Sequence, residues 1–258
     1  MNGRSLRFVE AALEPLQVST AVPLQRKAVV YEWNPTSSYL VSALHRAFSF
    51  RYVIVKRTID IILSLVLLVL FFPVGLTLGL VVMLTSRGPI FYCEEREGRF
   101  RVPFRIYKFR SMYICRQRPK VFHIRDGQVR DGHVANPQPA RENKCAGDPR
   151  ITPVGRVLRR ISLDELPQLW NVLKGDMSLV GPRPIVNKER RLYGNKLPYY
   201  DLFRPGITGL WQVSGRSDLD YDERVRLDCE YAACWSCFFD LAILVRTIPA
   251  VISMRGAY

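Results

Sequence analysis

The sequence predicts an α+β, mainly helical fold for a monotopic membrane protein, one that enters the bilayer from a single side. Three observations indicate this fold. A charge-free apolar run spans Ile61–Leu84, an alternating apolar and charged segment surrounds Gly98, and helical patterns fill the chain from Asp148 onward. With 258 residues, 48% of them hydrophobic, the chain is long enough for one large domain or two small ones.

The first part of the chain carries little pattern. Residues 1–51 are interpreted as an N-terminal extension of unknown role, with one helix near Tyr39–Phe50. Residues 52–258 are predicted to form a membrane-anchored domain whose re-entrant helix covers about 56–84.

The apolar run Ile61–Leu84 has the length of a membrane helix, because a bilayer core needs roughly 20 apolar residues. Both of its flanks are basic, with eight Lys and Arg against three Glu before Asp60. The positive-inside rule therefore favours both flanks in the cytoplasm. Pro73 removes a backbone donor near the middle of the run, which kinks or breaks a helix. Lys56, Arg57 and Pro73 are accordingly read as marks of a proline-broken re-entrant helix, and a kinked spanning helix is the alternative.

The next segment alternates apolar with charged residues from Pro89 to Met112 around Gly98, which is typical of a β-hairpin. Residues 115–147 are rich in Arg, Pro, Gly, Asn and Gln and are predicted to be a loop. Four helical patterns follow. The first begins with Thr152 as its N-cap and Pro153 as its first residue, and the second begins at Ser162 and stops at Gly175. The last two cover about Tyr221–Trp235 and about Phe238–Met254.

The charge balance indicates a polyanionic partner. The chain has 38 Lys and Arg against 23 Asp and Glu, a formal charge of +15, and a mean hydropathy of −0.01. Disorder is excluded, since it requires low hydrophobicity together with high net charge. Nucleic acid, or an anionic membrane with phosphorylated substrates, would each fit. Because the basic residues flank the apolar run, the membrane reading is favoured and no nucleic-acid partner is expected.

The six cysteines are scattered through the chain and do not form a disulfide framework. Cys234 and Cys237 form a CxxC pair without a second pair to complete a zinc site. Reduced thiols in a cytosolic environment are expected.

Adjacent carboxylates at Asp164 and Glu165 are the candidate catalytic residues. At the start of a helix, negative charge is stabilised, which favours an ionised carboxylate able to act as a nucleophile or a metal ligand. Ser162 and Glu165 also match a capping box, which would need no function.

Basic residues recur beside this pair in segments with Gly and Pro, whose backbone geometry suits phosphate binding. The candidate phosphate-binding residues are Arg183, Arg204 and Arg216 in such segments, Arg159 just before the acidic pair, and Lys108 and Arg110 at the end of the predicted hairpin. Their arrangement around one acidic pair, next to a membrane element, indicates phosphate transfer at the membrane interface. A membrane-tethered basic binding protein without catalysis is the alternative.

Ordered motifs now give a more specific resemblance. The chain is similar to the bacterial sugar transferase family, the monotopic polyprenyl-phosphate hexose-1-phosphate transferases (phosphoglycosyl transferases). The residues that match are Lys56-Arg57-x-x-Asp60, Gly88-Pro89-Ile90-Phe91-Tyr92, Lys108-Phe109-Arg110-Ser111-Met112, Asp148-Pro149-Arg150-Ile151-Thr152, Ser162 to Gln168, Lys174 to Pro184, and Arg204-Pro205-Gly206-Ile207-Thr208-Gly209. The resemblance covers roughly residues 52–258.

The resemblance implies a two-step reaction with a covalent intermediate. Asp164 would attack the β-phosphate of a UDP-sugar, with UDP-galactose or UDP-glucose favoured, and release UMP. Undecaprenyl phosphate would then accept the hexose-1-phosphate, which initiates exopolysaccharide, capsule or O-antigen synthesis. Glu165 would bind the cofactor Mg²⁺, and Arg159 would hold a phosphate.

The resemblance also implies where the protein works. Membrane lipids would surround the re-entrant helix in the bacterial inner (cytoplasmic) membrane, with the active site on the cytoplasmic face. A homodimer is compatible with the sequence.

Overall fold

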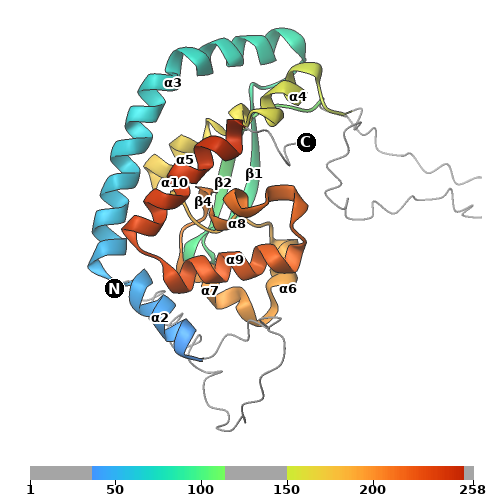
Figure 1. The fold of residues 1–258 in the computed structure, drawn as a ribbon. Coiled ribbons are helices and arrows are strands. Elements are labelled where there is room, and N and C mark those ends of the chain that lie inside the picture. Colours follow the sequence, from blue (N-terminus) through green and yellow to red (C-terminus); the bar gives the residue numbers. More distant parts are fainter. Residues whose placement is uncertain (1–36, 114–149, 253–258) are drawn as a thin grey trace, which may run out of the picture.

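The computed structural model describes residues 37–113 and 150–252 (Figure 1). The predicted loop at 115–147 and residues 1–36 of the predicted extension lie outside the described residues. The described part is mainly helical with a small antiparallel hairpin, as predicted. Helix α3 (Arg57–Thr85) arcs along one side of a domain that holds the other elements.

Helix α2 (Ser37–Ala47) belongs to the main core, although it lies within the predicted extension. Its Ala43 and Ala47 are fully buried. They pack in the same cluster as residues of α7 (Leu197–Leu202) and α9 (Tyr221–Cys234), both of which α2 contacts. The folded domain therefore includes residues before 52.

Helix α3 differs from its prediction in one respect. Pro73 lies inside the helix, and the helix continues through it, so the expected break is instead a continuous, curved helix (Figure 1). Proline leaves the carbonyl four residues earlier without its helical donor, which permits such curvature without ending the helix. The Thr77 hydroxyl donates to the Pro73 carbonyl at 2.9 Å, which adds a hydrogen bond at the same place.

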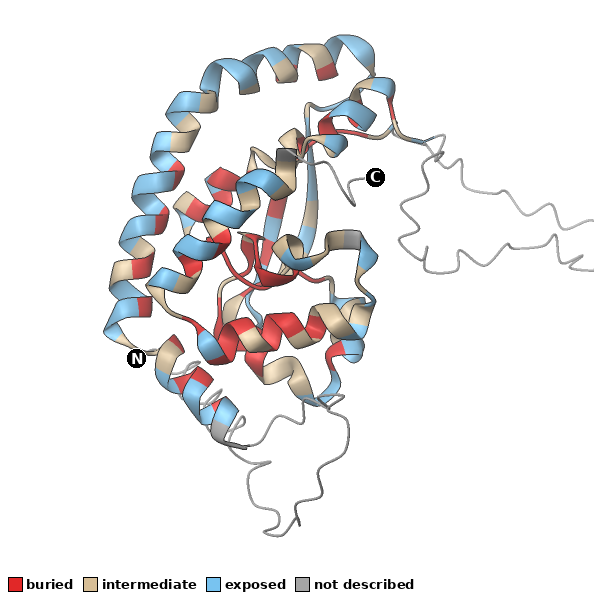
Figure 2. Ribbon diagram, in the orientation of Figure 1, coloured by how far each residue is buried: buried red, intermediate tan, exposed pale blue. Residues whose placement is uncertain are grey.

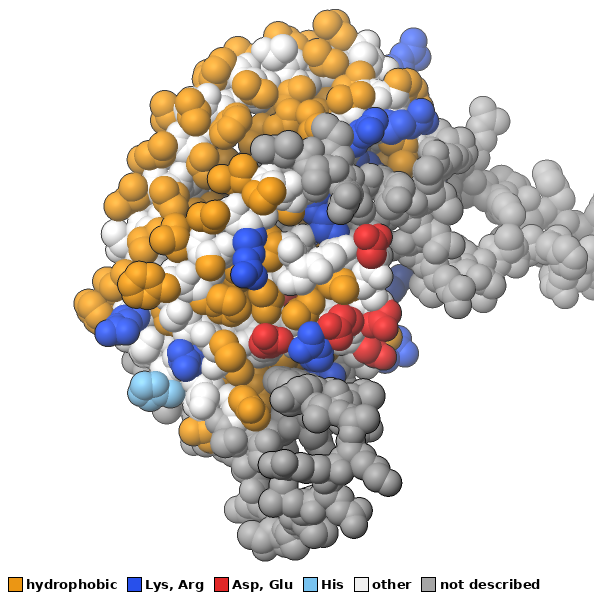
Figure 3. Space-filling view, viewed as in Figure 1, with side chains coloured by type: hydrophobic (Ala, Val, Ile, Leu, Met, Phe, Trp, Pro, Cys, Tyr) orange, Lys and Arg blue, Asp and Glu red, His pale blue; other side chains and the backbone are white. Residues whose placement is uncertain are grey.

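The outer surface of α3 is apolar and exposed, with Val69, Phe72 and Leu84 among its most exposed side chains. In the described part of the chain, one helical stretch, Arg51–Thr85, is long and apolar enough to cross a membrane. It combines a π-helical turn, Arg51–Lys56, with α3. Figure 3 shows hydrophobic side chains gathered over α3 and over α10 (Cys237–Ile252).

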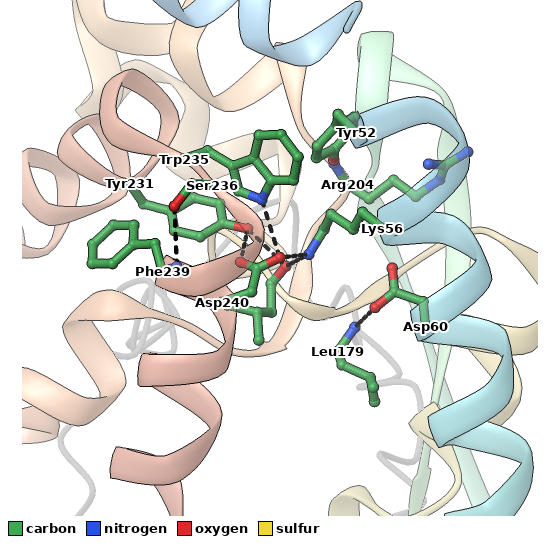
Figure 4. Close-up of polar contacts among 11 residues, drawn as sticks. Tyr52, Lys56, Asp60, Leu179, Arg204, Tyr231, Trp235, Ser236, Phe239 and Asp240 are labelled. Atoms are coloured by element: carbon green, nitrogen blue, oxygen red, sulfur yellow. Dashed lines mark hydrogen bonds and ion pairs between the residues drawn. The ribbon is translucent and has the colours of Figure 1, made fainter. Parts of the chain in front are cut away.

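The N-terminal end of α3 (the base of α3, Lys56 to Asp60) is joined to α10 through a buried ion pair (Figure 4). The Lys56 Nζ lies 2.6 Å from Asp240 Oδ2 and also donates to the Val180 carbonyl at 3.0 Å. Asp240 accepts further hydrogen bonds from the Tyr231 hydroxyl and the Trp235 indole N–H, at 2.8 and 3.0 Å. The desolvation cost of burying these two charges is offset because both oxygens of Asp240 accept hydrogen bonds.

Two neighbouring residues hold the same base to other elements. Asp60 accepts a hydrogen bond from the Leu179 backbone N–H at 3.1 Å (Figure 4). The Arg57 guanidinium donates to the carbonyls of Val172 and Leu173, near the end of α5 (Gln168–Lys174). A cation at a helix C-terminus pairs with carbonyls that have no helical partner. Lys56 and Arg57 thus join α3 to the domain.

The far end of α3 returns to the same domain. Val82 packs with Phe109 and Leu158 in a second, smaller core. The Arg110 guanidinium donates to the Ser86 carbonyl at 2.5 Å and to the Ser86 hydroxyl at 2.9 Å, directly after the helix ends. Both ends of α3 are therefore held on one body.

The predicted hairpin is confirmed. Strand β1 (Phe91–Glu97) pairs antiparallel with β2 (Pro103–Phe109), with Tyr92 opposite Lys108. Its turn contains Phe100 and Arg101 with left-handed φ of 56° and 61°. Strands β3 (Ser178–Val180) and β4 (Gly206–Thr208) form a second, parallel pair.

The remaining helices differ in length. Thr152 caps α4 (Pro153–Arg160), as predicted, because its side chain accepts from the Gly155 N–H at 2.8 Å. Gly175 ends α5 in the left-handed conformation at φ 93°, also as predicted. The bounds of helices α9 and α10 agree closely with those of the two predicted C-terminal helices. The others are α6 (Arg190–Tyr193) and α8 (Leu210–Ser214).

The main core lies where α2, α7, α9 and the parallel strands meet, and α3 contributes little to it (Figure 2). The apolar surface of α3 therefore remains available to the environment, while the opposite part of the domain provides a rigid frame for polar chemistry.

Candidate active site

The acidic pair lies in a 3₁₀ turn, Leu163–Glu165, between α4 and α5. The predicted capping box is wrong, because Ser162 makes no side-chain cap hydrogen bond and adopts a left-handed conformation with φ 57°. A left-handed residue other than glycine costs roughly 1–2 kcal/mol, and such strain is concentrated at functional sites. The turn buries Asp164 to 7% exposure and leaves about a third of the Glu165 side chain accessible.

Burial, followed by the charge of the neighbouring Glu165, raises the pKa of Asp164 to about 6. Lys108 and Arg159 act in the opposite sense and keep that pKa from rising more. The sequence predicted that a helix N-terminus would favour ionisation here. The actual balance differs because the pair precedes α5 and desolvation dominates. At neutral pH the carboxylate of Asp164 is still mostly ionised.

Lys108 of β2 pairs with Glu165, with Nζ 2.8 Å from Oε1. Burial lowers the pKa of Lys108, but the charges of Glu165 and Asp164 outweigh burial and raise it overall. Lys108 therefore keeps a positive charge beside both carboxylates.

Three of the predicted arginines belong to the same cluster. Arg159 of α4 donates from Nε to the Ser111 hydroxyl at 2.8 Å, and its charge acts on Asp164. The charge of Arg183 acts on Lys108. Arg216 has φ 53°; burial lowers its pKa, and the charge of Glu165 opposes that change.

Two predicted phosphate-binding residues make structural contacts elsewhere. Arg110 is 4% exposed and bonds to Ser86 at the end of α3. Arg204 donates from Nε to the Gly175 carbonyl at 3.0 Å, and its backbone N–H donates to the Tyr52 hydroxyl at 2.9 Å. The sequence analysis grouped these arginines with the others because each lies in a basic segment.

The donor set suits a magnesium ion bound mainly through substrate. No group of three or more His, Cys, Asp or Glu within metal-binding reach exists among residues 37–113 and 150–252. Mg²⁺ commonly binds one or two carboxylates and completes its shell with phosphate oxygens and water. Asp164 and Glu165 provide two such carboxylates, so they fit an ion that arrives with a diphosphate.

Residues outside the predicted set hold the loop that contains Arg183. The backbone N–H of Arg183 hydrogen-bonds to the carboxylate of Asp228, which also accepts from the Tyr193 hydroxyl at 2.8 Å. The carbonyl of Pro184 accepts from Arg96 at 3.2 Å. Asp228 and Asp240 were missed at the sequence level, although each is an acidic residue in a helix that is largely buried or apolar.

Close backbone approach fixes the same loop. The Gly181 N–H donates to the Thr208 carbonyl at 2.9 Å, and the Gly206 N–H donates to the Pro182 carbonyl at 2.8 Å. A Cβ on Gly181 would lie 2.3 Å from the Arg204 carbonyl oxygen, so only glycine fits. The loop is therefore rigid at its backbone.

Comparison with known proteins gives consistent matches. A family model described as bacterial sugar transferase matches residues 51–254. An undecaprenyl-phosphate galactose phosphotransferase of Salmonella typhimurium is 45% identical over 79% of this chain and 41% of its own length. The exopolysaccharide production protein ExoY of Rhizobium meliloti is 42% identical over 79% of this chain and 88% of its own length.

A third relative is the UDP-glucose:undecaprenyl-phosphate glucose-1-phosphate transferase of Caulobacter vibrioides, 39% identical over 79% of this chain and 72% of its own length. The chain thus spans less than half of the Salmonella protein but most of the other two. The region matched by the family model begins just before α3 and ends near the end of α10, so it includes the whole cluster around Asp164.

Proposed function

Because the chain belongs to the bacterial sugar transferase family, we propose that it transfers a hexose-1-phosphate from a UDP-sugar to undecaprenyl phosphate and releases UMP. UDP-galactose and UDP-glucose are the favoured donors, since relatives named for both sugars match the chain. The observation that carries the proposal is the buried Asp164, next to Glu165 and surrounded by Lys108 and arginines.

In the first step, a carboxylate oxygen of Asp164 attacks the β-phosphorus of the UDP-sugar. The bond from that phosphorus to the bridging oxygen breaks, and UMP leaves with the bridging oxygen and its electron pair. An acyl phosphate that bears the sugar remains on Asp164. A carboxylate with a pKa near 6 is largely ionised at neutral pH and is more basic than an ordinary aspartate, which suits it as the nucleophile.

In the second step, a phosphate oxygen of undecaprenyl phosphate attacks the same phosphorus. The bond to Asp164 breaks, the carboxylate is regenerated, and the product is a lipid-linked diphosphate sugar. Lys108, Arg159 and Arg183 offset the negative charge that both steps bring together.

Glu165, with its side chain partly accessible, would hold Mg²⁺ against the diphosphate. Bound there, the ion would supply positive charge to the transferring and leaving phosphates. Lys108 holds one Glu165 oxygen in place.

The membrane placement of the proposal is a re-entrant α3 in the bacterial inner membrane, with the active site at the cytoplasmic face. A straight helix of 29 residues would place its ends about 43 Å apart, at 1.5 Å per residue. Here Lys56 and Arg57 at one end and Val82 at the other contact the same domain, and the outer surface between them is apolar and exposed. A lipid-linked acceptor would then reach Asp164 from the membrane surface.

The reaction predicts a stoichiometric experiment. Purified protein in nanodiscs is mixed with UDP-galactose, UDP-glucose or other UDP-hexoses and Mg²⁺, without the lipid acceptor. Up to one UMP per active site is expected, together with a protein mass increase of one hexose phosphate. Undecaprenyl phosphate should then restore turnover and remove the added mass.

The decisive variant is Asp164→Asn, which keeps the shape of the side chain but removes the nucleophile. It should release no UMP and gain no mass. Turnover by this variant would refute the role of Asp164. If the wild-type protein releases no UMP from any nucleotide sugar, binding without catalysis becomes the better description.

A further inference from the structure

Trp211 of α8 is buried, with 5% exposure, beneath two guanidinium groups. The guanidinium carbon of Arg183 lies 5.7 Å from the centre of its ring system, and that of Arg224 lies 5.1 Å from it. Both distances are within the range in which an aromatic face attracts a cation. One tryptophan thus connects the loop after β3 with helix α9.

The side chain of Arg183 lies against the ring of Trp211, while other contacts fix its backbone. Its backbone is fixed by the N–H bond to Asp228 and by the glycine contacts between the parallel strands. Its guanidinium lies under the repulsive influence of Lys108. The ring of Trp211 is a neutral surface that attracts this cation and so opposes the repulsion from Lys108.

The second guanidinium extends the connection to Arg216. Arg224 donates from Nε and Nη2 to the Leu219 carbonyl, at 3.2 and 2.9 Å. Leu219 directly follows the 3₁₀ turn Arg216–Asp218, whose first residue has the left-handed φ and interacts electrostatically with Glu165. Trp211 and Arg224 together therefore connect two segments whose arginines interact electrostatically with Lys108 and with Glu165.

The state of the indole N–H indicates that Trp211 contacts the arginines through its ring face and not through the N–H. It is buried and has no hydrogen-bond partner among the residues that the structure describes. An unpaired buried donor is unfavourable, and a phenylalanine would avoid it. A ring face without the N–H should therefore be sufficient for the contact with both arginines.

We propose that Trp211 is a positioning residue that holds Arg183 toward the Lys108–Glu165 pair and, through Arg224, ties it to the Arg216 segment. This rests on the proposed function, in which Arg183 meets the diphosphate of the donor. Trp211 itself touches no substrate. Its effect reaches the reaction through the direction of the Arg183 guanidinium.

The test uses the full chain in nanodiscs and the variants Trp211→Leu and Trp211→Phe. UDP binding in magnesium-containing buffer is measured by calorimetry, and KM and kcat are measured for UMP release. Trp211→Leu should weaken UDP binding and raise KM by about threefold to tenfold with little change in kcat, because a cation–π contact that serves binding is lost. Trp211→Phe keeps a ring face and should restore most of the affinity.

The matched controls are Arg224→Gln and Arg226→Gln, which lie on the same helix. Arg226 pairs with Glu223 and Glu230 at the surface, so its replacement should leave UDP binding unchanged. Arg224→Gln should weaken UDP binding in the same direction as Trp211→Leu but less, because Arg183 keeps its ring. Thermal unfolding of each variant shows whether it remains folded.

Several outcomes would overturn the proposal. They are unchanged UDP affinity in Trp211→Leu, a fall in kcat at constant KM, which indicates a smaller folded fraction, or equal loss in Trp211→Phe and Trp211→Leu. A wild-type protein that binds UDP but releases no UMP would refute the proposed transfer alone, and the affinity series would still test Trp211. A wild-type protein that binds no UDP would refute both.

Discussion

The Lys108 Nζ lies 2.8 Å from Glu165 Oε1 and joins the β-hairpin to the turn that holds the acidic pair. Lys108 comes from β2 and Glu165 from the segment between α4 and α5, so 57 residues separate them in the chain. The pair therefore depends on the tertiary fold, and it places one fixed positive charge beside the proposed nucleophile Asp164.

Replacing Lys108 by methionine should slow UMP release by about tenfold to a hundredfold, the equivalent of one charge-assisted hydrogen bond. The charge of Lys108 no longer offsets the incoming diphosphate, and Glu165 loses its ion pair with Lys108. Initial rates at saturating UDP-sugar give the measurement, with Lys108→Arg expected to retain part of the activity. Lys188→Met removes an exposed lysine and serves as the control. Equal rates for Lys108→Met and Lys188→Met would contradict the assignment.

The ion pair of Lys56 and Asp240 should control stability rather than chemistry. Removing Lys56 alone leaves Asp240 buried without its cation. Because breaking a buried ion pair in this way costs roughly 3–5 kcal/mol, Lys56→Met should lower the free energy of unfolding by that amount. Lys56→Met combined with Asp240→Leu should lose clearly less than the sum of the two single changes. Denaturant unfolding in detergent measures both values. Additive losses would mean that the two side chains do not interact energetically.

Local signals in the sequence were sufficient for several of the regular elements. The alternation around Gly98 predicted the hairpin, and the Thr152 cap and the Gly175 stop marked helix ends that the structure has. These features depend on a few neighbouring residues, which is why they are visible without a structure.

Contacts between distant segments were not predictable in the same way. Arg110 and Arg204 look like Lys108 and Arg183 in their local sequence, yet they satisfy carbonyls at helix ends. The pKa of Asp164 was expected to reflect a helix N-terminus, but it depends on burial beside Glu165, which the fold creates. Pro73 curved α3 without breaking it because contacts with the domain hold both ends of the helix.

Asp228 should make stability depend on pH. Burial raises its pKa to about 7, while the Tyr193 hydroxyl and the Arg183 N–H oppose that rise. A carboxyl whose folded pKa exceeds its unfolded value binds more protons when folded, so its contribution to stability falls as pH rises between about 4 and about 7. Asp228→Asn cannot titrate and removes this contribution.

The wild-type protein should therefore lose stability relative to Asp228→Asn as pH rises, by up to about 1.4 kcal/mol for each pH unit in that interval. Unfolding midpoints are compared at half-unit steps from about pH 4.5 to about pH 7.5, which covers most of the interval between the unfolded and the folded pKa of Asp228. Asp222→Asn, an exposed residue in the first turn of α9, is the control and should follow the wild type. Parallel curves for wild type and Asp228→Asn would exclude the predicted titration.

The two ends of α3 should lie on the same side of the membrane. His45 on α2 is exposed before the helix, and the native Cys93 on β1 is exposed after it, so each can report one flank. With the other accessible cysteines replaced by serine, intact cells are treated with a membrane-impermeant maleimide. Neither a His45→Cys variant nor the Cys93 protein should be labelled until the cells are permeabilised, when both should react. A spanning α3 would instead expose one of the two positions in intact cells.

Pro73 provides the complementary change. Pro73→Leu restores a backbone N–H for the carbonyl of Val69 and removes a helix-interior proline, which costs roughly 3 kcal/mol or more in a straight helix. The straight, spanning form should become more favourable, opposed by the contacts of Lys56 and Arg110 that hold both ends of α3 to the domain. A spanning helix would put the two flanks on opposite sides, so labelling at one of the two positions, His45→Cys or Cys93, should rise in intact cells. Because Pro73→Leu combined with Lys56→Met weakens one of these attachments, it should increase the labelled fraction further. Unchanged protection in the double variant would mean that neither the proline nor the base of α3 controls how the helix sits in the membrane.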